Sequence, residues 1–267
     1  GQLTPHYHYV SRPPFTEAEA VRRAIYLAGQ TDTPLYIAHM TCREAIAELQ
    51  KAKGTGQRVS GETCTHYLTT TKEVLDNPDF NEAAKFVCSP ALRDQEDCEA
   101  LWQALAGGLL TAVSSDHCGI DVAELKQAGR DDFTQIPNGS PGAGDRLHMV
   151  WTEGVCTGKL SRQKFVDVIA TQPAKINGIY PRKGTLAVGS DADIVIFDPS
   201  YEGVIRLADN PNGVDYNLYE GRRQSGRVET VLLRGQVVVE NAKFVGRYGQ
   251  GQFIPASMYA SGYENRN

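Results

Sequence analysis

The stretch Thr111-Ala112-Val113-Ser114-Ser115-Asp116-His117-Cys118 decides the fold class. Its first residues suit a buried strand, because small and β-branched side chains fit a covered, pleated surface. An acid, an imidazole and a thiol follow at once. Reactive groups at the carboxyl tip of a buried strand are typical of active sites on parallel sheets. From this stretch alone, Asp116 could bind a divalent metal, act as a base or cap the next helix.

Short strands and helices alternate in the residues before this stretch. Strands are predicted over 34–39 and 58–62, and helices over 16–29, 44–51 and 95–105. The first helix is expected to begin with a capping box, in which Thr16 is the N-cap and Glu19 the third helical residue. Such alternation predicts parallel strands joined by right-handed crossovers.

Two of the predicted strands end in side chains that can bind a metal. His39 ends the strand over 34–39, and Asp116 follows the strand over 111–115. Both side chains are therefore expected at one edge of the sheet, where reactive groups converge in a (β/α)8 barrel. A complete barrel takes roughly 250 residues. About 180 residues precede a change of pattern at Lys183, so the barrel is predicted to be incomplete.

The second part of the chain predicts a small β domain. Residues 149–176 have helical spacing, with breaks expected near Gly158 and at Pro173. Short strands with glycine turns follow, over 192–198, 229–235 and 236–240. We therefore assign residues 1–182 to the barrel part, 183–252 to the β domain and 253–267 to a loosely held tail rich in glycine, serine and asparagine.

The composition is that of a globular protein and does not indicate nucleic acid or membrane partners. The chain has 267 residues and a net charge of −5, which gives no reason to expect nucleic acid or an anionic membrane as a partner. No run of about 18 apolar residues predicts a membrane span, and the first residues lack the features of a signal peptide. The six cysteines are scattered without a CxxC pair, which favours reduced thiols in a cytoplasmic protein.

Motifs along most of the chain resemble those of the dihydropyrimidinase/D-hydantoinase family of cyclic amidohydrolases, in its C-terminal portion. Their order and spacing together make the resemblance specific. The motifs are Tyr7-His8, Ser11-Arg12-Pro13-Pro14, Ala38-His39, Gly61-Glu62-Thr63-Cys64, Val87-Cys88-Ser89-Pro90-Ala91-Leu92-Arg93, Ser115-Asp116-His117-Cys118, Gly129-Arg130-Asp131-Asp132-Phe133, Ile136-Pro137-Asn138-Gly139, Ala174-Lys175-Ile176, Tyr180-Pro181-Arg182-Lys183-Gly184 and Gly189-Ser190-Asp191-Ala192-Asp193.

The resemblance implies a TIM-like barrel flanked by a small β-sandwich domain, and a metal-dependent hydrolase that opens the cyclic amide of hydantoins or dihydropyrimidines. The family's site holds two divalent metal ions, usually zinc, bridged by a carbamylated lysine. The last metal-binding histidine and the aspartate match His39 and Asp116, and Asp116 would also transfer the proton. The His-x-His pair, the lysine and another histidine of the family precede the matching region, so this chain alone is expected to be inactive. Family members are often homotetramers.

Ser89 and Asn138 match the positions at which the family holds a small cyclic ureide or imide. Backbone amide and carbonyl groups complement the donor–acceptor edge of such a ring. Ser-Pro and Asn-Gly also mark turns, and a fixed turn can itself present backbone groups. We therefore keep both interpretations for these two residues.

Other polar residues are assigned to structural roles. His6 and His8 form a His-x-His pair, but they lie in a polar segment without a strand, so we reject them as metal ligands. His66 and His117 are expected to support the site without binding metal, and Cys118 has no partner histidine that would make it a nucleophile. Lys175 and Lys183 lie outside the barrel strands and should not be the bridging lysine. Trp102 and Leu105 are expected in the core.

Three other members of the wider superfamily remain as alternatives. Residues 62–68 resemble allantoinases, whereas the block from Asp131 to Gly139 favours hydantoinases; dihydroorotase is a further enzymatic alternative. Collapsin response mediator proteins share the architecture without the metal site, and they depart from the family at the aspartate and the Asn-Gly positions. This chain has Asp116 and Asn138 at those positions, which favours an enzyme.

Overall fold

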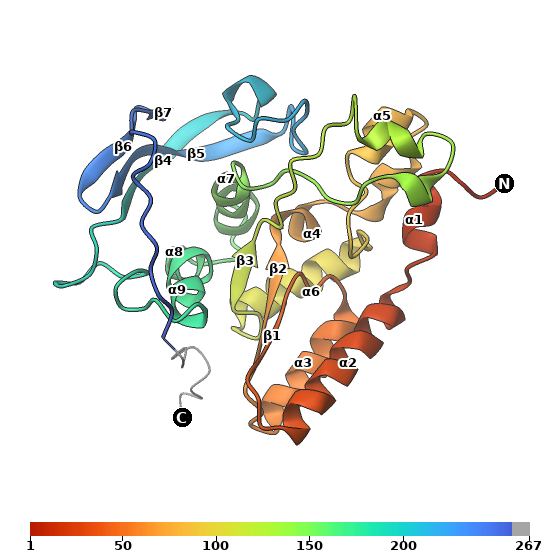
Figure 1. Cartoon of the computed structure of the whole chain (residues 1–267), viewed down its shortest axis with the longest axis horizontal. Coiled ribbons are helices and arrows are strands. Elements are labelled where there is room, and N and C mark those ends of the chain that lie inside the picture. The colour runs from red at the N-terminus through yellow and green to blue at the C-terminus, as the bar shows by residue number, and fades with distance from the viewer. Residues whose placement is uncertain (258–267) are drawn as a thin grey trace.

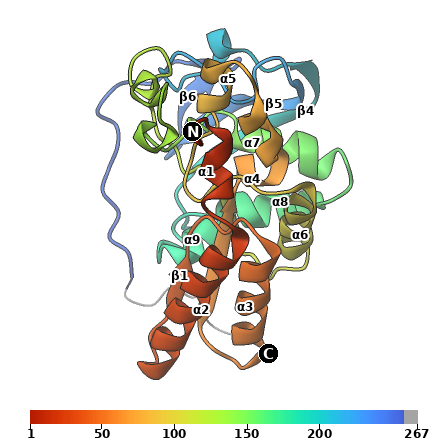
Figure 2. The same cartoon turned by 90° about the vertical axis from the view of Figure 1, so that its right-hand side faces the viewer.

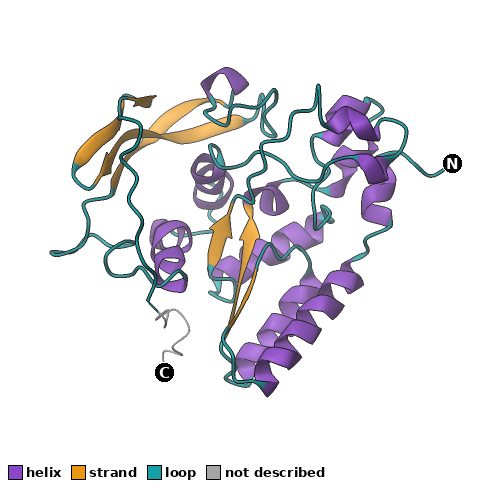
Figure 3. Ribbon diagram, in the orientation of Figure 1, coloured by secondary structure: helices purple, strands orange, loops and turns teal. Residues whose placement is uncertain are grey.

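The computed structural model describes residues 1–257 and shows an α/β protein with two separate sheets (Figure 1, Figure 3). The first sheet has three parallel strands in the order β1-β2-β3, and the second has four antiparallel strands in the order β4-β5-β6-β7. The strands are β1 (Leu35–Ile37), β2 (Val59–Cys64), β3 (Ala112–Ser114), β4 (Ile194–Val204), β5 (Arg223–Leu233), β6 (Gln236–Glu240) and β7 (Lys243–Phe244).

The first sheet confirms the predicted parallel strands. Leu35 pairs with Val59, and Glu62 pairs with Ala112, so the three strands follow one another in chain order. Helix α3 (Arg43–Gly54) connects β1 to β2, and α6 (Gln95–Ala106) precedes β3. Helix α2 (Pro14–Gln30) runs beside α3, as Figures 1 and 2 both show. The carboxyl ends of all three strands therefore meet at one edge of the sheet.

The core lies between this sheet and helices α3 and α6. Trp102 and Leu105 are buried, as predicted, and the Trp102 Nε1–H donates to Leu68 O at 2.9 Å. Gly61 lies in the central strand, and a Cβ there would come within 2.6 Å of Met40 Sδ. The Met40 side chain therefore packs directly over Gly61, and a larger residue at position 61 would have to displace it.

Helix α2 begins earlier than the sequence pattern predicts. Its first residue is Pro14, and Thr16 lies in its first turn, where the Thr16 hydroxyl donates to Pro13 O at 2.8 Å. The predicted capping box of Thr16 and Glu19 is therefore wrong. Proline has φ fixed near the helical value and needs no N–H partner in the first turn, so Pro14 sets the start instead.

The helical region after β3 is more continuous than expected. Helix α7 (Arg146–Val150) passes into a π-helical turn over 151–155, and the predicted break follows around Gly158. From residue 162, α8 (Arg162–Val166), a π-helical turn over 167–171 and α9 (Gln172–Ile176) follow without a gap. The predicted break at Pro173 is wrong, because Pro173 occupies the first turn of α9 after the π-helical turn.

The remaining helices are short. They are α1 (His6–Val10), α4 (Thr65–Thr69) and α5 (Phe80–Ala84), with 3₁₀ turns at Lys72–Asp76, Lys126–Gly129, Phe133–Gln135 and Leu207–Asp209. Across residues 1–257, no helix combines the length and apolar character needed to cross a membrane.

The second sheet contacts the helical region through aromatic side chains. Trp151 lies 4.9 Å from Phe197 of β4 and 5.3 Å from Phe165 of α8, measured between ring centroids. Strands β4 and β5 extend beyond the predicted ranges and pair from Ile194–Leu232 to Val204–Arg223. In the predicted tail, the Ser257 amide donates to Gly178 O at 2.9 Å, whereas residues 258–267 lie outside the described part.

Candidate active site

His39 and Asp116 follow the tips of β1 and β3. Both have a positive φ, 39° for His39 and 44° for Asp116, a conformation that non-glycine residues rarely adopt. Strand β2 lies between the two strands, so two strand spacings place the tips about 10 Å apart at the backbone. Residues held in this conformation cluster at functional sites. The structure thus places both predicted metal ligands at the same edge of one sheet.

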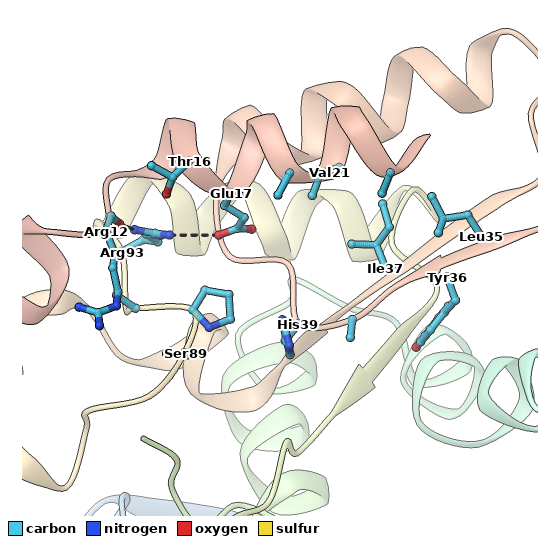
Figure 4. Close-up of a pocket in the computed structure, with 15 residues that line it drawn as sticks. Arg12, Thr16, Glu17, Val21, Leu35, Tyr36, Ile37, His39, Ser89 and Arg93 are labelled. Atoms are coloured by element: carbon cyan, nitrogen blue, oxygen red, sulfur yellow. Dashed lines mark hydrogen bonds and ion pairs between the residues drawn. The ribbon is translucent and has the colours of Figure 1, made fainter. Parts of the chain in front are cut away.

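His39 lines a cavity of about 600 Å³ between α2 and β1 (Figure 4). Val21, Leu35 and Ile37 form part of its apolar wall, and Ser89 and Arg93 come from a loop that is distant in sequence. The residues of strand β1 are only half-buried. Among the described strands, β1 pairs with β2 alone, and its other edge borders this cavity.

A buried ion pair fixes the connection that follows His39. Arg93 Nη2 donates to Glu17 Oε2 at 3.1 Å, with both side chains at least nine-tenths buried (Figure 4). The Thr41 amide donates to Glu17 Oε1 at 2.8 Å, and Arg93 Nε donates to Thr41 Oγ1 at 2.9 Å. These hydrogen bonds join three segments that are distant in sequence: α2, the β1–α3 connection and the loop after Ser89. The sequence placed Glu17 only in a predicted helix and Arg93 only in a family motif, so neither residue was predicted to form this ion pair.

The two predicted substrate-binding residues contact each other. Ser89 Oγ donates to Asn138 Oδ1 at 3.0 Å, and both residues are exposed. Next to this contact, the Gly139 amide donates to Val87 O at 3.0 Å and Ser140 Oγ donates to Lys85 O at 2.7 Å. The Ser89 loop and the Asn138 turn are therefore one connected surface, although 49 residues separate the two side chains in sequence.

The Asn138 turn also packs against the Asp116 loop. Gly139 has a φ of 131°, and a Cβ there would lie 2.5 Å from Cys118 Cβ. The Cys118 amide donates to Ser140 O at 3.0 Å, and His117 Nδ1 accepts from the Gly142 amide at 3.3 Å. Because only glycine fits this approach, the Asn-Gly pair is needed to place Asn138 beside the loop that carries Asp116.

A single lysine, missed by sequence reasoning, lies beneath the Ser89–Asn138 surface. Lys126 is fully buried, and its ammonium donates to the carbonyls of Ala84, Val87 and Gly139. Burial lowers the pKa of Lys126 to about 8.

Burial favours the neutral forms of two further groups, His66 and Cys88. His66 follows β2 and is buried, and its Nε2 has no hydrogen-bond partner. Burial, with a smaller contribution from His39, lowers the pKa of His66 to about 3. Burial also raises the pKa of the Cys88 thiol to about 11, so Cys88 is not a thiolate near neutrality.

The residues rejected as ligands have other partners. His6 Nδ1 lies 2.6 Å from Asp76 Oδ1, and His8 Nε2 lies 2.7 Å from Cys88 O. Since a carbonyl only accepts, His8 Nε2 carries the proton and donates it. Lys175 is in α9 and lies over the Tyr180 ring, whereas Lys183 pairs with Asp191 at 3.0 Å; neither is in the parallel sheet.

Imidazole and carboxylate are donor types that zinc accepts, so His39 and Asp116 fit part of a metal centre. Their placement at one sheet edge, with both side chains accessible to solvent, agrees with that chemistry. Within residues 1–257, no group of three or more histidine, cysteine or acidic side chains is arranged to hold a metal ion. His39 and Asp116 thus offer two of the three or four protein donors that zinc normally takes.

Comparison with known proteins identifies the relatives of this chain. It is 48% identical over 259 residues to the D-hydantoinase of Ralstonia pickettii, a match that covers 97% of this chain and 56% of that protein. It is 41% identical over 261 residues to the dihydropyrimidinase of Arabidopsis thaliana, covering 97% of this chain and 49% of that protein. The crystal structure of dihydropyrimidinase from Brevibacillus agri superposes with a TM-score of 0.95 at 45% identity, over 97% of this chain and 56% of that one.

The chain spans about half the length of the curated relatives that it matches. The model of the family described as "Amidohydrolase family" matches residues 27–238, a range that includes all three parallel strands and both strand-tip residues. On this match and on the geometry of the strand tips, the chain belongs to the amidohydrolase family.

Proposed function

We propose that this chain carries one part of the active site of a metal-dependent hydrolase that opens the cyclic amide of hydantoins and dihydropyrimidines. One observation carries the proposal: His39 and Asp116 follow the tips of two strands of one parallel sheet with the same rare backbone conformation. The names of the relatives, D-hydantoinase and dihydropyrimidinase, support this choice of substrate class.

The same comparison supports a proposal for the architecture. We infer that β1, β2 and β3 are three strands of a TIM-type barrel and that the antiparallel sheet is part of a β-sandwich domain. Parallel strands with crossover helices and reactive residues at their carboxyl ends are the arrangement on which such barrels build active sites. The half-buried outer edge of β1 agrees with a barrel strand whose second neighbour is not among the described residues.

Each site residue has a chemical role in this proposal. His39 and Asp116 hold divalent metal ions, for which zinc suits the donor types, and further ligands come from outside the described residues. When bound, such metal ions polarise a carbonyl and make hydroxide available near neutrality. The Asp116 carboxylate would take a proton from the attacking water and pass it to the ring nitrogen as the bond between that nitrogen and the carbonyl carbon breaks. The backbone around Ser89 and Asn138 binds the alternating donors and acceptors of the ring edge.

A hybrid enzyme tests the proposal. This chain replaces the segment that it matches in the D-hydantoinase of Ralstonia pickettii, and hydrolysis of hydantoin, dihydrouracil, allantoin and dihydroorotate is measured with zinc supplied. Faster turnover of hydantoin or dihydrouracil than of the other two compounds supports the proposal. A preference for allantoin or dihydroorotate contradicts the substrate class, and a folded hybrid without hydrolysis contradicts the enzyme itself. The 267-residue chain alone should show no hydrolysis.

A further inference from the structure

Lys126 is a buried cation whose hydrogen-bond partners are all carbonyl oxygens. Its side chain is 0% exposed, and Nζ lies 2.8 Å from Ala84 O, 3.2 Å from Val87 O and 2.8 Å from Gly139 O. No carboxylate is among these partners. Burying an ammonium group costs several kcal/mol unless its donors are satisfied. Three carbonyls satisfy all three N–H donors, so this position is built around a lysine.

The three carbonyls belong to the two segments that carry the proposed substrate-binding residues. Ala84 is the last residue of α5, and Val87 lies two residues before Ser89. Gly139 directly follows Asn138. One ammonium group therefore joins the Ser89 loop to the Asn138 turn from below. The Ser89–Asn138 hydrogen bond joins the same two segments on the exposed side.

We propose that Lys126 is a positioning residue for the substrate, which holds the Ser89 loop and the Asn138 turn at the spacing that the ring edge of a cyclic ureide requires. This inference rests on the proposed function. Lys126 does not contact the substrate itself, because its side chain is fully buried. It acts through the backbone, because its hydrogen bonds fix the orientation of three peptide units. Two of these units lie within two residues of Ser89 or Asn138, and the third lies at the end of α5, which leads into the Ser89 loop.

Replacement by an apolar residue should loosen this surface without touching the metal ligands. Lys126→Met keeps the length of the side chain but removes the ammonium donor that the three carbonyls share. Ala84 O and Val87 O then keep only the bonds from the Val87 and Gly139 amides, and the buried Gly139 O loses its lysine donor. The Gly139–Val87 and Ser140–Lys85 hydrogen bonds remain, so the two segments stay in contact but lose their fixed spacing. Lys126→Gln keeps two N–H donors and should show a smaller effect. Lys53→Met is the matched control, because Lys53 Nζ also donates to a carbonyl, Leu109 O at 2.7 Å, near the opposite end of β3.

The experiment combines two readouts. Hydrogen–deuterium exchange is measured on the 267-residue chain over residues 84–90 and 136–142, and steady-state kinetics on hydantoin are measured in the hybrid enzyme. Lys126→Met should speed exchange in both segments and raise KM about tenfold or more, with kcat changed by less than about threefold. Lys126→Gln should fall between Lys126→Met and wild type, and Lys53→Met should match wild type in both readouts.

The outcomes separate this inference from the proposed function. Unchanged exchange in both segments, or an unchanged KM in Lys126→Met, overturns the role of Lys126 while hydantoin hydrolysis by the wild-type hybrid still stands. If Lys126→Met does not fold, Lys126→Gln decides by the same two measurements. A folded wild-type hybrid that does not hydrolyse hydantoin contradicts the proposed function and, with it, the substrate-positioning role of Lys126.

Discussion

His39 and Asp116 have nearly the same φ, 39° and 44°, at the tips of two strands separated by β2. For residues with a Cβ this conformation costs of order 1 kcal/mol or more each, and it persists where the surrounding structure enforces it. Its effect here is to end each strand sharply and leave both side chains at the same edge of the sheet. Backbone strain and placement of the proposed metal ligands are thus linked at both positions.

This strain predicts an unusual order of stability at position 116. Asp116→Gly should be more stable than Asp116→Ala by about 1 kcal/mol, because glycine adopts positive φ without a Cβ penalty. Urea unfolding of the two variants measures the difference. The control is Ser114, which lies in β3 with extended backbone, and there alanine should be the more stable replacement. Equal stability of the two position-116 variants would show that the residue is not strained.

The Arg93–Glu17 pair should contribute strongly to folding, because both side chains are buried. Arg93→Met leaves the Glu17 carboxylate without its cation and should lower the free energy of unfolding by about 3–5 kcal/mol. The matched control is Arg23→Met, which removes the exposed pair with Glu19 on the same helix, where the side chains are 66% and 60% exposed. That change should cost less than about 0.5 kcal/mol. Similar losses in the two variants, measured by urea unfolding, would contradict the role assigned to the buried pair.

Stability should fall in mild acid because of His8. Burial lowers the pKa of His8 from 6.5 to about 4, so below pH 6.5 the unfolded chain binds a proton that the folded chain does not. The contribution is present in full above pH 6.5 and is lost as the pH falls towards 4. A shift of this size corresponds to about 3 kcal/mol.

Replacing the imidazole tests this pH dependence. His8→Gln keeps an N–H that can donate to Cys88 O but cannot bind a proton, so the difference in unfolding free energy between pH 7 and pH 4.5 should shrink by about 2–3 kcal/mol. His6→Gln is the control, because His6 is partly exposed and pairs with Asp76 at the surface. An undiminished pH dependence in His8→Gln would mean that His8 is not the group that titrates.

Local patterns predicted the elements that bear the site. The apolar run before Asp116 and the spacing of Leu101, Trp102 and Leu105 are signals carried within one segment, and the structure confirms the strand and the helix. The start of α2 was missed although it is also local. Thr16 and Glu19 match a capping box, but the Pro13-Pro14 pair fixes the backbone three residues earlier.

Contacts between distant segments could not be predicted. A lysine is almost never fully buried, so there was no reason from sequence to place Lys126 in the interior. Its partners are 42, 39 and 13 residues away in sequence. Glu17 reaches Arg93 across 76 residues. Ser89 and Asn138 were each indicated by resemblance, but their hydrogen bond depends on how two loops meet. Contacts of this kind depend on the tertiary fold, and the sequence of a single segment does not predict them.

The most direct test of the central claim compares the wild-type hybrid with its Asp116→Asn variant, using hydantoin hydrolysis with zinc supplied. Asparagine keeps the size of the side chain and tolerates positive φ, so the variant should fold with an unchanged melting temperature. Because it can neither take the proton nor bind metal as a carboxylate does, kcat/KM should fall by about 10²–10⁴-fold. An Asp116→Asn variant that hydrolyses hydantoin at the wild-type rate would contradict the account.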